Sequence, residues 1–276
     1  MTSSDGKKYL LRISPLEQCD IKKDEFEIMK KVSSLGVPMC QPIEFGTCEE
    51  GVYSLQSWID GKDAEEVIPL LSDTKQYNYG IEAGRILKKI HSIPAPAGQE
   101  NWGVRFNRKI DMMIQKYRKT GIRVDGDDEI IEYIDNNRHL IEKRLSCFCH
   151  GDYHAGNIMI ENNKLIIIDF ERFDFGDPWW DFHPDFWDGE KIPCFFTGII
   201  TGYFQGRLSE SFFNTLIYYF AYDVLIGMYR EPKNKKWIRD NINCWKNAMQ
   251  NTVPTWYTIP KEIKNESSVS NTSDTL

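Results

Sequence analysis

One stretch of the chain, residues 149–170, limits the possible folds more than any other. It contains Asp152 and Asn157 in a glycine-containing segment, followed by the apolar run Lys164-Leu-Ile-Ile-Ile168 and then by Asp169. A β-branched apolar run of this length is typical of a buried strand. Asp169 is therefore expected to emerge at the end of a strand and to face a cleft.

The spacing of the polar residues indicates a chemistry. Asp152 and Asn157 have the separation found in the catalytic loop of protein kinases, where the Asp takes the proton of the substrate hydroxyl and the Asn binds Mg²⁺. Phosphoryl transfer requires charge neutralisation on the phosphate oxygens and in-line placement of the attacking hydroxyl. From its position we predict Asp152 as the base. Because Mg²⁺ prefers carboxylate and amide oxygens, we predict Asn157 and Asp169 as the metal ligands.

The length and composition limit the classes of protein to which the chain can belong. The 276 residues are enough for one or two domains, and 41% hydrophobic with 27% charged residues is ordinary for a globular protein. No apolar run approaches the roughly 20 residues that span a bilayer, and residues 1–8 lack a secretory apolar core, so we expect a cytoplasmic protein without a membrane partner. The net charge of -7 argues against a nucleic-acid partner. It would attract a cationic small molecule, but a mildly acidic chain is also common among soluble cytoplasmic proteins, and this second interpretation is the favoured one.

The seven cysteines are odd in number and scattered, which predicts free thiols rather than a disulfide framework. Cys147 and Cys149 precede His150, but no second Cys/His pair at zinc-finger spacing is present. Core filling is therefore favoured over zinc binding.

The pattern of apolar residues predicts a small N-terminal part followed by a larger helical part. Strands are expected over 8–14, 43–48 and 52–58, with a helix over 22–35. Further helices are expected over 77–91, 110–117, 129–145, 190–206, 209–229 and 235–249. We therefore divide the chain into an N-terminal lobe (1–58), a helical C-terminal lobe (59–260) and a disordered tail (261–276), which is rich in Ser, Asn and Thr.

Three motifs together carry a family resemblance. His150-Gly-Asp-Tyr-His-Ala-Gly-Asn157, Ile168-Asp-Phe170 and Gly176-Asp-Pro-Trp-Trp-Asp181 resemble the aminoglycoside phosphotransferase family of kinase-like small-molecule kinases, and the likeness extends over roughly residues 8–185. It implies an α+β, protein-kinase-like fold with a small β-rich N-lobe and a larger, mainly helical C-lobe. It also implies ATP or GTP between the lobes, with Mg²⁺ bridging the phosphates.

The resemblance assigns further residues to the nucleotide site. Arg12 occupies the strand position where the kinase pattern has a phosphate-binding lysine, and Glu25 matches the helix glutamate that orients this residue. Arginine can serve because its guanidinium binds phosphate through two donors. Backbone groups of Gln56, Ser57 and Trp58 are expected to contact the base of the nucleotide.

The acceptor is expected to be a small molecule with a free hydroxyl, in first place an aminoglycoside. Asp181, Asp185 and Asp188 lie among tryptophans and could form an acidic, aromatic pocket for a cation. Two other interpretations stay open, a solvated acidic turn and, for Asp181, support of the catalytic loop. Macrolides, choline-like alcohols and sugars are alternative acceptors, and antibiotic resistance would be one biological outcome.

Two rival functions follow from the same residues. Only residues 1–8 precede the strand of Arg12, so the phosphate-covering hairpin of kinase-like enzymes is expected to be missing from this sequence. The start of the chain could be displaced, the protein could use nucleotide without this cover, or it could have lost catalysis and be a pseudokinase that binds nucleotide or a small molecule. Alternatively, His150, Asp152, His154 and Asp169 could form the metal site of a hydrolase, because alternate residues of an extended segment point to one face.

Overall fold

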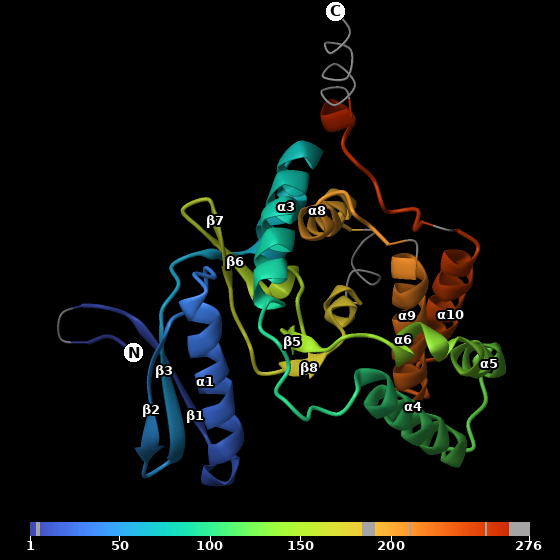
Figure 1. The fold of residues 1–276 in the computed structure, drawn as a ribbon, viewed down its shortest axis with the longest axis horizontal. Helices are drawn as coiled ribbons and strands as arrows, with labels where there is room; N and C mark the ends of the chain where they lie inside the picture. The colour runs from blue at the N-terminus through green and yellow to red at the C-terminus, as the bar shows by residue number, and fades with distance from the viewer. Residues whose placement is uncertain (4–5, 184–190, 210, 252, 265–276) are drawn as a thin grey trace, which may run out of the picture.

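The protein has two lobes, a small one built on a sheet and a larger, mainly helical one (Figure 1). The computed structural model describes residues 1–3, 6–183, 191–209, 211–251 and 253–264. This arrangement confirms the predicted α+β, kinase-like fold. The expectations for Asp185 and Asp188, and for residues 265–276 of the tail, lie outside the described residues, while residues 261–264 form one helical turn.

The small lobe is an antiparallel sheet covered by one helix. Strand β3 (Gly51–Ser57) lies between β1 (Tyr9–Ser14) and β2 (Pro42–Cys48). Helix α1 (Cys19–Ser34) runs along this sheet in Figure 1 and buries apolar side chains that recur every three or four residues, among them Met29. The predicted strands and helix of this lobe are confirmed to within three residues at each end.

The two lobes meet through backbone pairing around one hairpin, β6 (Ile158–Glu161) and β7 (Lys164–Ile167). The short strand β4 (Lys62–Asp63) pairs with β6. On the other side, the Ile167 amide donates to Pro38 O at 2.8 Å, and Cys40 N donates to Ile167 O at 3.3 Å. The hairpin that precedes Asp169 is thereby fixed between the lobes.

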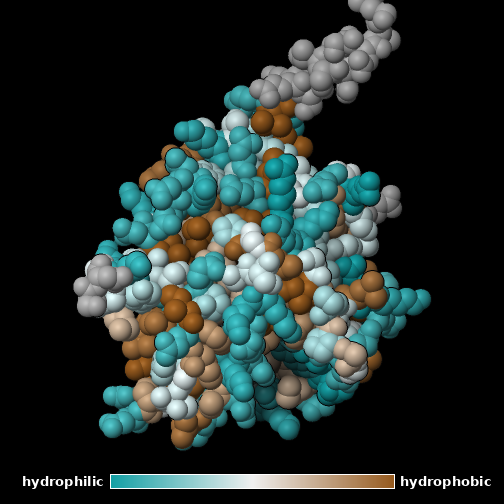
Figure 2. All heavy atoms as spheres, turned by 60° about the vertical axis from the view of Figure 1, so that its left-hand side comes forward, coloured by the Kyte–Doolittle hydropathy of each residue, from teal (hydrophilic) through white to brown (hydrophobic). Residues whose placement is uncertain are grey.

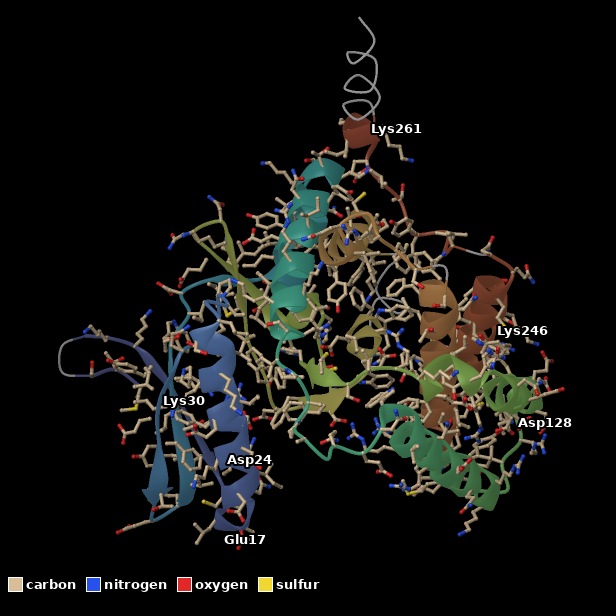
Figure 3. All side chains as sticks on the ribbon, in the orientation of Figure 1. Glu17, Asp24, Lys30, Asp128, Lys246 and Lys261 are labelled. Atoms are coloured by element: carbon tan, nitrogen blue, oxygen red, sulfur yellow. The ribbon has the colours of Figure 1, made fainter. Side chains whose placement is uncertain are left out.

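The large lobe packs its helices around an aromatic core. Its longer helices in the described residues are α3 (Asp73–Ile90), α4 (Trp102–Lys119), α5 (Asp127–Asn137), α8 (Pro193–Phe204), α9 (Ser211–Arg230) and α10 (Lys235–Met249). Helix α9 is buried over most of its circumference, as expected from its dense aromatic sequence. Lys246 of α10 pairs with Glu129 of α5 at 2.7 Å, close to the labelled Asp128 in Figure 3.

Two predicted helices differ from the observed ones. The predicted helix 110–117 is only the second half of α4, which begins after Asn101, whose side chain accepts a hydrogen bond from Val104 N at 3.2 Å and caps the helix. The predicted helix 129–145 divides into α5 and the short α6 (His139–Glu142). The junction is Arg138, whose guanidinium contacts Asp111 at 2.6 Å and Asp135 at 2.7 Å.

The surface alternates between hydrophilic and hydrophobic residues over the face shown in Figure 2. Among the described residues, no helix is long and apolar enough to cross a membrane. All seven cysteines carry free thiols, as the sequence predicts.

Candidate active site

The end of the β6–β7 hairpin brings Asn157 and Asp169 together. Ile158 pairs with Ile167 in the hairpin, and the Ile168 amide donates to Asn157 O at 3.0 Å. Asn157 therefore lies just before the first strand and Asp169 just after the second, at the same end of the hairpin. Asp169 has a φ of 63°, a left-handed conformation that Asp adopts more readily than most residues.

Asp152 lies against Asn157. The Asn157 Nδ2 donates to Asp152 O at 2.8 Å and to Asp152 Oδ2 at 3.0 Å, which leaves the amide Oδ1 for another partner. The structure thus assembles the three residues that the sequence singled out.

The oxygen atoms present at this point fit a divalent cation. Asp169 Oδ1 is buried without a hydrogen-bond partner among the described residues, and Arg12 Nη1 lies 3.7 Å from it. A buried carboxylate oxygen without a partner costs free energy, which a bound cation would offset. Together with the Oδ1 of Asn157, it would supply hard oxygen ligands of the kind that Mg²⁺ prefers.

The surroundings of Asp152 keep its carboxylate ionised. Partial burial raises the pKa of Asp152, but the interactions with His154, Arg172 and Asn157 outweigh this effect and lower the pKa to about 2. Arg172 Nη1 lies 3.2 Å from Oδ1, and His154 Nε2 lies 3.6 Å from Oδ2. Asp152 is therefore charged at neutral pH and accepts rather than donates hydrogen bonds.

Asp181 supports the loop that carries Asp152, residues 150–157, from behind. It lies on a short 3-10 helix, η4 (Pro178–Phe182), and is 1% exposed. Its two oxygens accept the amides of His150 and Gly151, each at 2.7 Å, and Oδ2 also accepts His91 Nε2 at 2.9 Å. The expectation that Asp181 lines a substrate pocket is wrong, because its carboxylate faces the loop backbone; the supporting role is the one observed.

His150 connects this loop to the strand of Asp169. Its Nε2 donates to Ile168 O at 3.0 Å, and burial lowers the pKa of the imidazole, so the ring is neutral. The turn itself requires glycine at position 151, where φ is 83° and a Cβ would lie 1.9 Å from Arg172 O.

The helix that carries Asp181 is held by a buried ion pair that the sequence did not indicate. Arg144 donates to both oxygens of Asp177, each at 2.8 Å, and the Tyr219 hydroxyl donates to Asp177 Oδ2 at 2.7 Å. Asp177 also caps η4 by accepting Trp179 N at 3.0 Å. The Gly-Asp-Pro motif therefore has a structural role.

The charged residues of the small lobe pair differently from the expectation. Among the described side chains, Arg12 pairs with Glu171 at 2.8 Å and not with Glu25. Glu25, which is 7% exposed, instead accepts Lys22 Nζ at 2.9 Å, and the same Nζ contacts Glu171 at 3.0 Å. Lys22 lies one helical turn before Glu25 on α1, so the two side chains pair within the helix and Glu25 does not pair with Arg12. Neither Lys22 nor Glu171 was predicted as a site residue.

The three residues that were expected to contact the base of the nucleotide differ in their exposure and in their hydrogen bonds. The Gln56 side chain is 3% exposed and donates to Met29 Sδ at 3.7 Å, inside the small lobe. Ser57 N donates to Gln41 O at 2.9 Å, and Ser57 Oγ accepts Gln41 N at 2.8 Å. Trp58 is 48% exposed. A role of these three residues in binding the base stays a prediction.

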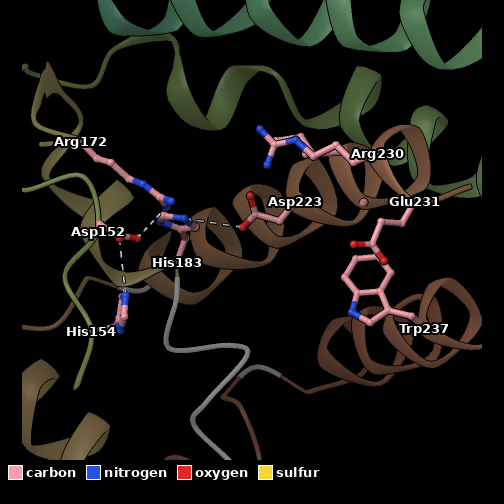
Figure 4. A pocket seen from close by; sticks show the side chains of 10 residues that line it. Asp152, His154, Arg172, His183, Asp223, Arg230, Glu231 and Trp237 are labelled. Carbon is pink, nitrogen blue, oxygen red and sulfur yellow. Dashed lines mark hydrogen bonds and ion pairs between the residues drawn. The ribbon is translucent and has the colours of Figure 1, made fainter. Parts of the chain in front are cut away.

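A cavity of about 490 Å³ opens beside Asp152 (Figure 4). Its charged and aromatic lining includes Asp152, His154, Arg172, His183, Asp223, Arg230, Glu231 and Trp237. Side chains from α9 and α10 thus line the same cavity as Asp152, and His183 Nε2 lies 3.9 Å from Asp223 Oδ2. Sequence reasoning did not select any residue of α9 or α10 for this site.

The sequence model of the phosphotransferase enzyme family matches residues 1–207. The chain belongs to the phosphotransferase enzyme family. This membership agrees with the resemblance carried by the three motifs. No curated protein sequence matches the chain.

Solved structures show the same fold for this phosphotransferase at low sequence identity. The ADP-bound aminoglycoside phosphotransferase APH(2'')-Ib is 20% identical with a TM-score of 0.61, and the match covers 91% of this chain and 88% of the APH(2'')-Ib chain. AMP-bound spectinomycin phosphotransferase APH(9)-Ia is 15% identical with a TM-score of 0.60, covering 91% and 86%. A choline/ethanolamine kinase family protein from Mesorhizobium loti is 15% identical with a TM-score of 0.59, covering 88% and 82%.

The metal-hydrolase alternative lacks its ligand set in this phosphotransferase. His150 is fully buried with its Nε2 donating to Ile168 O, and among the described residues no group of metal-ligand atoms includes His150 with Asp152 and Asp169. Among the described residues, ligand atoms of His91, Cys147 and Cys149 lie within 4.8 Å of one another. Both His91 nitrogens are already hydrogen-bonded, to Tyr203 and Asp181, so this group gives no support to zinc binding.

Proposed function

We propose that the protein transfers the γ-phosphoryl group of ATP or GTP to a hydroxyl of a small molecule. The observation that carries the proposal is the convergence of Asp152, Asn157 and Asp169 at one end of the hairpin, beside a cavity large enough for a small acceptor. The bound ADP and AMP named for two structural neighbours support a nucleotide as the donor.

Asp152 positions the attacking hydroxyl in this proposal. The new bond joins the acceptor oxygen to the γ-phosphorus, while the bond from that phosphorus to the bridging oxygen of the nucleoside diphosphate breaks. A carboxylate with a pKa of about 2 is a weak base, so Asp152 mainly orients the hydroxyl and takes its proton late, when the new bond makes that proton acidic.

Asn157 and Asp169 would hold Mg²⁺ through their side-chain oxygens. The ion, when bound, neutralises charge on the phosphate oxygens of the nucleotide. His150 and Asp181 fix the loop and the strand end from which these ligands project. Their contribution is to keep the site in place before the nucleotide arrives.

A hydroxylated amine, such as an aminoglycoside, is the proposed acceptor. Asp223 and Glu231 line the cavity beside Trp237, and an acidic group next to an aromatic ring suits an ammonium ion. Two structural neighbours are named as complexes with gentamicin and with streptomycin and ATP, which supports this class. Asp223 and Glu231 replace Asp181 as candidates for binding a cation.

The test is nucleotide turnover over a panel of hydroxylated amines. ADP release, followed by a coupled assay, is expected with at least one aminoglycoside or amino alcohol, and Asp223→Asn should raise KM for that acceptor about tenfold without changing KM for ATP. Release with neutral sugars but not with amines would contradict the acceptor class. No release over the whole panel with either ATP or GTP would contradict the transfer itself.

A further inference from the structure

A single carboxylate oxygen of Glu171 contacts two cations of the small lobe. Arg12 Nη1 on β1 lies 2.8 Å from Glu171 Oε1, and Lys22 Nζ on α1 lies 3.0 Å from the same oxygen. Glu171 itself follows Asp169 by two positions and belongs to the other lobe. Two donors from separate elements thus point to one anionic oxygen next to a proposed metal ligand.

Glu25, the buried glutamate of helix α1, pairs with Lys22 and not with Arg12. In protein kinases the helix Glu pairs with the lysine that contacts the phosphates, and this pair is required for activity. Here Glu25 is buried and holds Lys22 at 2.9 Å, while Arg12 is paired elsewhere. The ammonium of Lys22 therefore stands in the relation to Glu25 that the phosphate-binding lysine has in a kinase, although it comes from the helix itself.

Glu171 is the exchangeable member of this group of charges. Its side chain is 42% exposed, against 9% for Glu25, so solvent and a ligand reach it more easily. A terminal phosphate oxygen can accept the same two charge-assisted hydrogen bonds that Glu171 Oε1 accepts. If the carboxylate stayed in place, its negative charge would oppose the polyphosphate of a nucleotide.

We infer that Lys22 and Arg12 together bind the phosphates of the nucleotide, and that Glu171 is an internal competitor that occupies these two cations until the nucleotide displaces it. This inference rests on the proposed function in one respect, that the ligand is a nucleoside di- or triphosphate. It adds a second phosphate-binding cation and an anion that must leave.

Binding of ADP to the full chain tests the inference without relying on turnover. Titration calorimetry with metal-free ADP, in EDTA, is expected to give a Kd about tenfold higher for Lys22→Met, because a charge-assisted contact is lost. Glu171→Gln is expected to lower the Kd about threefold, since an exposed competing ion pair is removed. Lys22→Arg, which retains the charge, should bind ADP more tightly than Lys22→Met.

A second ion pair on the same helix provides matched controls. Lys30 and Glu27 are also three residues apart on α1, at 3.2 Å, and both side chains are 53% exposed. Lys30→Met and Glu27→Gln should leave the Kd within about twofold of the unaltered protein. Far-UV circular dichroism of every variant identifies any that does not fold, and Glu171→Gln keeps the size of the side chain so that folding is preserved.

The outcomes separate this inference from the proposed function. ADP binding by the unaltered protein that Lys22→Met does not weaken would overturn the role of Lys22 and leave the proposed function standing. Weaker metal-free binding by Glu171→Gln would show that Glu171 assists the nucleotide instead of competing with it. Absence of ADP binding by the unaltered protein in EDTA would contradict the inference, and absence of binding with added Mg²⁺ as well would contradict both.

Discussion

At the scale of single residues, the loop that carries Asp152 depends on a carboxylate buried behind it. Asp181 is buried and accepts hydrogen bonds from two loop amides and from His91. Asp181→Asn places an amide group against those donors, and we expect it to lower the free energy of unfolding by about 3 kcal/mol. Asp174→Asn is the control, because its pair with Arg105 is partly exposed and should contribute below about 1 kcal/mol. Urea unfolding of the two variants measures the difference.

The stabilisation by Asp181 also has a predicted pH dependence. Burial raises the pKa of Asp181, but the interactions with His91, His150 and the Gly151 amide outweigh it, so the pKa is lowered. A carboxyl group whose pKa is lowered by folding stabilises the protein above its unfolded pKa of about 3.9 and loses this effect as the pH falls further. The difference between the unaltered protein and Asp181→Asn should therefore shrink below about pH 4. A difference that grows on acidification would contradict this account.

From the sequence, the residues of the proposed site could be selected, but their partners could not. Asp152, Asn157 and Asp169 could be selected because they lie in one short stretch of the chain, around the hairpin β6–β7. The pairing of Arg12 with Glu171 could not, since it joins residues 159 positions apart. The cavity residues of α9 and α10 were missed for the same reason, because the apolar pattern of these helices indicates burial and says nothing about which loop their ends face.

At the scale of elements, the close contact of α3 and α8 depends on glycines. A Cβ on Gly84 would lie 2.0 Å from Ile199 O, and one on Gly198 would lie 2.3 Å from Tyr77 O. The two helices lie side by side in Figure 1, with their backbones in contact at these positions.

Alanine at position 84 tests this packing. It improves helix propensity by about 1 kcal/mol, but the clash with the backbone of α8 should outweigh this gain and destabilise the protein by about 2 kcal/mol net. Thermal unfolding measures the effect, with Lys88→Ala on the exposed side of α3 as the control. A Gly84→Ala variant at least as stable as the unaltered protein would show that the helices can move apart without cost.

Long elements could be predicted from the sequence and short ones could not. Helix α10 was predicted at its observed bounds because apolar residues repeat over several turns. Strands β4, β5 (Cys147–Cys149) and β8 (Asp174–Gly176) have two or three residues each, too few for any periodicity. Each exists because a partner strand from a distant part of the chain is present, which is tertiary information.

At the scale of the whole molecule, the hairpin β6–β7 is shared between the lobes. The small lobe pairs with it through Pro38 and Cys40, and the connection between the lobes pairs with it through β4. The predicted boundary at residue 58 therefore separates two lobes with one continuous apolar core. In the proposed function, this continuity would keep groups of both lobes, Arg12 and Asp152 among them, in place around one nucleotide.

The central claim is that Asp152 directs transfer of a phosphoryl group to a hydroxyl. The most direct measurement is the rate at which the best acceptor of the panel gains one phosphoryl group, followed by mass spectrometry at saturating nucleotide, for the unaltered protein and Asp152→Asn. We predict that Asp152→Asn lowers kcat by about 100-fold or more while the Kd for ADP changes less than about twofold, and that Asp111→Asn, on the surface of α4, changes neither. An Asp152→Asn variant that transfers phosphoryl at the rate of the unaltered protein would contradict the claim.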